Sequence, residues 1–210
     1  MSQPREYYVY NIPLFVMEGL NENIDIPQFC NEVEELIPKI LLKNIEVIYI
    51  IDFKDGADKN AVFSNDAIYM TAKEPTNFDM LENFVHETAH SLESSYGWNI
   101  YDEALVQEFK GKRMRLRSLL EAQGYKINPL LYNFSEYNQK FDEFLAHEVG
   151  YPTLLSLTMG LFVSPYGATS IQEYFANGFE KYFLDDPRTV RDISPVLYRK
   201  IEEIINDDEA

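Results

Sequence analysis

The first 75 residues alternate between short apolar runs and polar connectors, a pattern typical of β-strands. Three runs are rich in aromatic and β-branched residues, which favour strands; they span residues 6–12, 45–53 and 61–71. We expect the first strand to end at Pro13 and the second to be buried, because it is almost continuously apolar. The third is expected to form a hairpin or a single irregular strand. Asp55-Gly56 predicts a turn before it.

Between the first two runs, a helix is predicted over residues 27–42. Pro27 suits its first turn, where the missing N–H is not needed. The inward-facing positions recur every three or four residues: Phe29, Val33, Leu36, Ile37 and Ile40. Pro38 lies inside this pattern and is expected to kink or split the helix.

Beyond residue 100, apolar residues at helical spacing predict helices over about residues 101–124, 135–148, 152–162, 170–184 and 195–205. Gly124 is expected to end the first of these helices. Thr169 and Gln172 have capping-box spacing, which would start the fourth helix near Ser170. The basic residues between 110 and 117 are expected to form a solvated helix face. The pattern as a whole predicts an α+β fold.

Composition and charge argue against several classes of protein. The formal net charge is -17, with 35 acidic residues against 18 basic ones, so we expect no nucleic-acid partner. Cys30 is the single cysteine, which leaves no internal disulfide. No apolar stretch reaches the roughly 18 residues of a membrane span, and the first twenty residues lack a signal-peptide profile. We therefore expect a cytoplasmic protein, or one carried in a virion or another assembly.

The strongest chemical signal is the sequence His86-Glu87-Thr88-Ala89-His90, an H-E-x-x-H motif within a helix predicted over residues 76–93. Thr76 is its expected N-cap, and Tyr96 to Asn99 its expected end. The buried face is marked by apolar residues at helical spacing: Phe78, Leu81, Val85, Ala89 and Leu92. His86 and His90 are one turn apart, so they can bind one metal ion while Glu87 holds a water beside it. The alternative is an exposed helix with two surface histidines.

Two histidines alone do not make a catalytic zinc site, because such sites take three protein ligands. The remaining histidine is His147, which lies in the sequence HEVG and lacks a second histidine at metal-binding spacing. It is expected to be a helix-surface or core residue. A carboxylate must then complete the ligand set, and spacing alone does not select one among the many acidic residues.

A resemblance to a known family does select one. The segment YGATSIQEYFANGF, residues 166–179, resembles the third-ligand helix of the anthrax lethal factor-type zinc metallopeptidases. These are gluzincins and include the Pro-Pro endopeptidases; their H-E-x-x-H motif is followed by a Tyr-Gly loop and a helix of the form E-F-F-A-E-A-F. HETAH is itself a familiar form of the motif in this group. The resemblance covers about residues 76–95 and 164–205, whereas the first 75 residues fit only in the order of their elements.

The resemblance implies a role for each matching residue. His86, His90 and Glu173 would bind one Zn²⁺ ion, and Glu87 would be the general base. Tyr166 would stabilise the reaction intermediate. Asn177 stands where the family usually has a second acidic residue, which would weaken the support of a ligand imidazole.

The resemblance also implies an architecture. A single metallopeptidase-like domain would span residues 1–210, with a small strand-helix-strand sheet packed on a mainly helical zincin-type region. Its N-terminal α/β part would span residues 1–75 and the H-E-x-x-H helix region 76–100. A helical insertion would follow at 101–163, because the interval between His90 and Tyr166 is longer than in the family. Residues 164–210 would hold the third-ligand helix and the C-terminal helix. The strand within 61–71 would form the upper rim of the cleft and pair with an extended peptide.

Three functions remain open at this point. The first is a zinc-dependent endopeptidase that hydrolyses a peptide or protein substrate with a metal-activated water. The second is a catalytically weak or inactive subunit with the same fold, in which zinc acts as a staple and partner chains build a larger assembly such as a virion. The third is a metal-dependent hydrolase acting on something other than a peptide.

Overall fold

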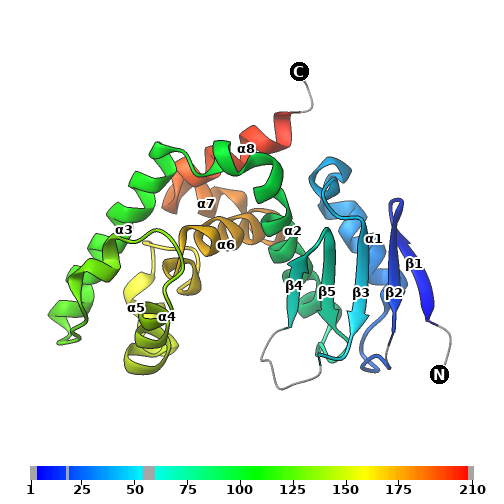
Figure 1. Cartoon of the computed structure of the whole chain (residues 1–210), viewed down its shortest axis with the longest axis horizontal. Coiled ribbons are helices and arrows are strands. Elements are labelled where there is room, and N and C mark those ends of the chain that lie inside the picture. The colour runs from blue at the N-terminus through cyan, green and yellow to red at the C-terminus, as the bar shows by residue number, and fades with distance from the viewer. Residues whose placement is uncertain (1–3, 18, 54–59, 208–210) are drawn as a thin grey trace. The chain divides into compact units, whose positions relative to one another are not determined.

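The computed structural model describes residues 4–17, 19–53 and 60–207, which form an α+β fold with an N-terminal sheet, as predicted (Figure 1). The chain divides into two compact units. The first comprises residues 1–95 and 204–210, and the second comprises residues 96–203. The predicted division of a single domain into four segments stays a prediction. None of the helices in the described ranges has the length and apolar character that crossing a membrane requires.

The first unit contains a five-stranded sheet in the order β1-β2-β3-β5-β4 (Figure 1). The strands are β1 Arg5–Val9, β2 Ile12–Val16, β3 Val47–Ile51, β4 Ala61–Ser64 and β5 Ala67–Thr71. β3 is parallel to both β2 and β5, whereas β1 and β4 are antiparallel to their neighbours. β4 is therefore an edge strand of the sheet that the described residues form.

The N-terminal prediction of one strand ending at Pro13 was wrong. Tyr10 adopts a positive φ of 53° and turns the chain, so that β1 and β2 form a hairpin with Pro13 inside β2. Pairing of β2 with β3 begins at Leu14, so β3 needs no N–H from residue 13. Of the two alternatives predicted for residues 61–71, the hairpin is observed, with Asn65 and Asp66 at positive φ in its two-residue turn. The predicted turn at Asp55-Gly56 lies outside the described residues.

One face of the sheet carries the core of the first unit. Its buried side chains come from the three inner strands: Leu14, Val16, Ile48, Ile50, Ile68 and Met70. α1, Ile26–Leu36, and the first part of α2, Asn77–Ile100, lie behind the sheet in Figure 1. The rings of Phe29 and Phe84 join these two helices edge to face, with centroids 5.7 Å apart. The chain thereby buries an apolar helix face against an apolar sheet face.

The helix predicted over residues 27–42 is split at Pro38, as expected. α1 ends at Leu36 and a 3₁₀ turn, Lys39–Leu42, follows the proline. Asp25 caps the helix by accepting a hydrogen bond from the Gln28 N–H at 3.0 Å. Leu36 was predicted to face inward but is exposed. The backbone becomes extended at Ile37, which takes the buried position instead.

α2 is longer than predicted. Thr76 caps it by accepting from the Asp79 N–H at 3.2 Å, as expected, but the helix continues through Gly97 to Ile100. A glycine inside a helix costs only about 1 kcal/mol, and burial of Tyr96 and Ile100 offsets this cost. Phe78 was predicted to be buried and is 53% exposed, because it lies in the first turn, before the helix reaches the core.

Glu74, in the turn before α2, is a buried carboxyl group. It is 2% exposed, and it accepts a hydrogen bond from Asn83 Nδ2 at 2.9 Å. Burial, and then the nearby charge of Asp79, raise the pKa of Glu74 from 4.5 to about 7. The folded chain therefore binds more protons than the unfolded chain between these two values. Stability should fall as the pH rises from about 4.5 to about 7, and stay at the lower level above that.

We expect Glu74→Gln to remove this fall, because glutamine is neutral at every pH and can still accept from Asn83. At pH 8 the variant should be more stable than the parent by about 1–3 kcal/mol. Urea unfolding at pH 5 and pH 8 measures the difference, with the exposed Glu35→Gln on α1 as a control that should keep the parent's pH dependence. An unchanged pH dependence in Glu74→Gln would contradict the assignment.

The second unit is helical, with α6 at its centre (Figure 1). Its α-helices after the last turns of α2 are α3 Glu103–Ala122, α4 Gln139–Glu143, α5 Tyr151–Thr158, α6 Ile171–Leu184, α7 Pro187–Ile193 and α8 Pro195–Asn206. Gly124 ends α3 at φ +88°, as predicted. The helix predicted over 135–148 begins only at Gln139 and continues as the π-helix η3, Phe144–Val149. Tyr174 of α6 packs against Phe109 and Phe162, with ring centroids 5.4 and 5.8 Å away.

The basic residues of α3 are not all solvated, which corrects the prediction for residues 110–117. Lys112 is 9% exposed, and its ammonium donates to the carbonyls of Leu161 at 2.7 Å and Ile193 at 2.6 Å. Burial lowers the pKa of Lys112 to about 8. The charge is thus used inside the unit to satisfy carbonyl groups at the ends of other segments.

Arg113 is completely buried and holds the chain just before α6. Its guanidinium donates to the carbonyls of Ala168 at 3.0 Å, Thr169 at 3.2 Å and Leu131 at 2.7 Å. The same group lies 3.8 Å from the ring centroid of Phe141, a cation–π contact. Arg113 therefore fixes the backbone at the start of the helix that carries Glu173.

Gly178 brings α6 close to α8. A Cβ atom at this position would lie 2.2 Å from Leu197 Cδ2 and 3.0 Å from Cγ, which is too close for two carbon atoms. We expect Gly178→Ala to destabilise the protein by about 1–3 kcal/mol through overpacking. Gly111→Ala on α3 is the matched control, because nothing lies within 4 Å of its Cβ position. Helix propensity should make that variant more stable, by about 0.5–1 kcal/mol. Equal effects in thermal unfolding would contradict the packing argument.

Candidate metal centre

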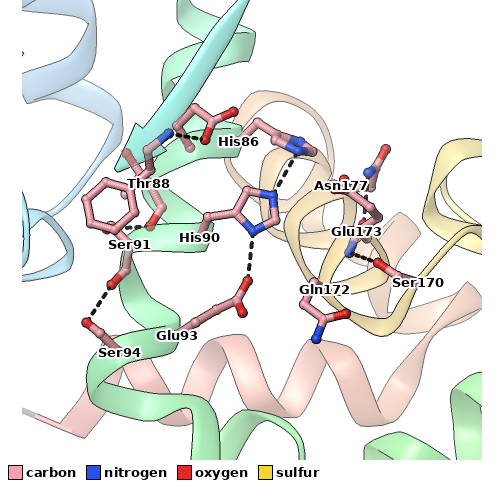
Figure 2. A network of polar contacts seen from close by, with 12 residues as sticks. His86, Thr88, His90, Ser91, Glu93, Ser94, Ser170, Gln172, Glu173 and Asn177 are labelled. Atoms are coloured by element: carbon pink, nitrogen blue, oxygen red, sulfur yellow. Dashed lines mark hydrogen bonds and ion pairs between the residues drawn. The ribbon is translucent and has the colours of Figure 1, made fainter. Parts of the chain in front are cut away.

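The two histidines of the H-E-x-x-H motif face each other from successive turns of α2 (Figure 2). Both side chains are half-buried, and their Nε2 atoms are 3.3 Å apart. Two nitrogens bound to one tetrahedral zinc ion, with Zn–N bonds of about 2.0–2.1 Å, are themselves about 3.4 Å apart. The spacing of these two nitrogens would allow both to bind one metal ion.

His90 has a carboxylate partner behind it that the sequence analysis did not single out. Its Nδ1 lies 2.7 Å from Glu93 Oε1, on the ring side away from His86 (Figure 2). A carboxylate in this position favours the tautomer with the proton on Nδ1, which leaves the Nε2 lone pair for a metal. The signal was present in the sequence, because Glu93 follows His90 at i+3 on the same helix face.

Glu87 is half-buried beside the two histidines and has one backbone partner. Its Oε2 accepts a hydrogen bond from the Phe63 N–H of the edge strand β4 at 2.7 Å. The general base proposed from the motif is thus held by the sheet as well as by its own helix.

Glu173 lies in the first turn of α6. Ser170 is the N-cap of this helix, and its Oγ accepts from the Glu173 N–H at 3.1 Å (Figure 2). The predicted cap at Thr169 was one residue early. Asn177, one turn further on, donates from Nδ2 to the Glu173 main-chain carbonyl at 2.8 Å. The Asn177 amide is therefore held against its own helix, one turn after Glu173.

Tyr166 lies in a 3₁₀ turn, Tyr166–Ala168, shortly before α6. Its side chain is half-buried, and burial raises its pKa above the ordinary value of 10.0. The charges of Glu173 and Asp142 raise the pKa further, which indicates that the phenol lies near both carboxylates. At neutral pH Tyr166 is therefore a neutral O–H donor.

Among the described residues, one group of histidine, cysteine and carboxylate side chains could hold a metal ion. It consists of His86, His90 and Glu173; each offers one ligand atom, and these atoms lie within 4.8 Å of one another. Two imidazoles and one carboxylate are a ligand set of catalytic zinc sites. His147 does not belong to the group; it is exposed on η3, in line with a surface residue.

Comparison with known proteins adds no relative from which a function could be transferred. The function of the chain therefore has to be inferred from the chemistry of the side chains described above. No family model matches the chain, and neither does any curated protein or solved structure.

Proposed function

We propose that the chain is a zinc-dependent endopeptidase of the gluzincin type, similar to the anthrax lethal factor-type metallopeptidases. The observation that carries the proposal is the set of three ligand atoms, from His86, His90 and Glu173, within 4.8 Å of one another. The 3.3 Å between the two Nε2 atoms is compatible with both histidines binding one zinc ion. Bound zinc would polarise the scissile carbonyl and lower the pKa of a coordinated water to about 7.

The residues of the chain then have separate tasks. Glu87 takes the proton from the attacking water and passes it to the leaving amine. Tyr166 donates a hydrogen bond to the oxyanion that develops on the carbonyl oxygen. Glu93 keeps the proton of His90 on Nδ1, so that Nε2 stays a ligand.

The edge strand β4 is the proposed binding element for the substrate backbone. Among the described strands, β4 pairs with β5 alone and lies at the edge of the sheet. An extended peptide could add to it by main-chain hydrogen bonds, the general mode of strand addition. Such binding requires an extended substrate and places few demands on its side chains.

The experiment that tests the proposal is cleavage of a diverse peptide library by the purified protein loaded with one equivalent of zinc. Mass spectrometry of the products should reveal internal cleavage that stops when a chelator is added and resumes when zinc is restored. If no peptide in the library is cut, the enzymatic proposal fails.

A second candidate, a subunit of a larger assembly, is favoured by apolar side chains exposed on the second unit. Those between residues 130 and 160 are Leu130, Phe134, Tyr137, Tyr151, Leu155 and Met159. Where exposed apolar side chains form a contiguous patch, they are typical of interaction sites. Light scattering on the sample used for the peptide library would distinguish the candidates, because an inactive protein that forms stable oligomers supports the second.

A further inference from the structure

We propose that the backbone N–H of Phe63 is a positioning group for Glu87, so that the edge strand orients the general base. The role of Glu87 as general base rests on the proposed function. The claim that Phe63 fixes the orientation of the Glu87 carboxylate rests on the geometry of the first unit alone. Both residues lie in that unit, and the Phe63 nitrogen is 2.7 Å from Glu87 Oε2.

The hydrogen-bond pattern of β4 explains why this N–H is available. The Thr71 N–H donates to the Asn60 carbonyl at 2.7 Å, and β4 continues antiparallel to β5 from there. Hydrogen-bonded pairs alternate with non-bonded pairs in an antiparallel ladder. The pairs of Val62 with Tyr69 and of Ser64 with Ala67 are therefore the bonded ones. The N–H groups of Ala61 and Phe63 point away from β5.

Of these two outward N–H groups, the one at Phe63 reaches the carboxylate of Glu87. The bond links a side chain on α2 to a main-chain group of a five-stranded sheet, and a backbone donor in a sheet moves far less than a side chain. A glutamate has three side-chain torsions, so without a fixed donor its carboxylate would sample several orientations. A base held in one orientation loses less entropy in the transition state.

The kinetic experiment compares Phe63→Pro with Ala61→Pro in the zinc-loaded protein, using a peptide found in the library. Each substitution removes one outward N–H and no ladder bond, which edge strands tolerate. Phe63→Pro should lower kcat about 10- to 100-fold, because Glu87 loses its donor. Ala61→Pro should raise KM and keep kcat within about twofold, because its N–H points away from β5 and its proposed use is pairing with substrate.

The structural experiment needs no activity and uses hydrogen exchange read by NMR. In the zinc-loaded protein, Glu87→Ala should speed exchange of the Phe63 amide on the order of 10- to 100-fold, and leave the Ala61 amide unchanged. Unchanged exchange at Phe63 would overturn the inference. So would equal kcat values for the two proline variants of an active enzyme. If the parent cuts no peptide, the proposed function fails, and exchange alone decides whether Phe63 holds Glu87.

Discussion

Replacement of Glu87 by glutamine should abolish peptide hydrolysis while leaving the metal in place. Glutamine has almost the same shape and can still accept a hydrogen bond from the Phe63 N–H, so the helix and the edge strand should keep their contact. It cannot take a proton from water at neutral pH. Loss of a general base typically costs 10²- to 10⁴-fold in rate, so kcat should fall by about that factor.

The measurement is steady-state cleavage of one peptide, combined with zinc analysis of the same samples. Zinc content should stay at one equivalent, because Glu87 lies outside the proposed ligand set. Glu32→Gln on α1 is a suitable control; the Glu32 carboxylate accepts from Gln28 and lies outside the candidate centre. A Glu87→Gln variant with parental kcat would exclude Glu87 as the base.

The second large effect should follow from Glu173→Gln. The substitution keeps the size of the side chain but replaces a charged ligand oxygen with a neutral one. We expect the Kd for zinc to rise about 100-fold or more, because a neutral amide is a much weaker ligand for a divalent cation than a carboxylate.

The effect can be read from thermal unfolding with zinc and with chelator. At a zinc concentration 100 times the parental Kd, binding stabilises the parent by about 2.7 kcal/mol, which corresponds to about 5–10 °C in Tm. With a Kd raised 100-fold, the same zinc should stabilise Glu173→Gln by only about 0.4 kcal/mol, or 1–2 °C. The exposed Glu148→Gln should retain the parental shift. A parental shift in Glu173→Gln would exclude Glu173 as a ligand, whether or not the protein is an enzyme.

Local patterns predicted the parts of the site that lie on one helix. His86, Glu87 and His90 are related by the 3.6-residue period alone, so their arrangement follows once the segment is helical. Their 3.3 Å nitrogen spacing agrees with that prediction. Glu93 could have been found by the same reasoning, because His90 and Glu93 are neighbours on the helix surface. Glu173 could not, since spacing does not relate residues 83 positions apart, and a resemblance had to supply it.

Other errors arose where local and tertiary preferences differ. Lys112 and Arg113 are charged and were assigned to a solvated face, yet both are buried because they satisfy carbonyl groups of distant segments. Leu36 and Phe78 fit the apolar period and are exposed, because they lie in the last turn and the first turn of their helices. Hydrophobic period locates a face of a helix but does not say where along that face the core begins or ends.

The amino-acid order by itself determined the α+β class, the interruption of the first helix at Pro38 and the pairing of two imidazoles one turn apart. These features depend on torsion preferences and on contacts between residues a few positions apart. Tertiary structure alone decided which cations are buried and which backbone N–H faces Glu87. Each of these depends on a contact between segments far apart in the chain. Such contacts stabilise the fold, but no periodic pattern in the sequence identifies them.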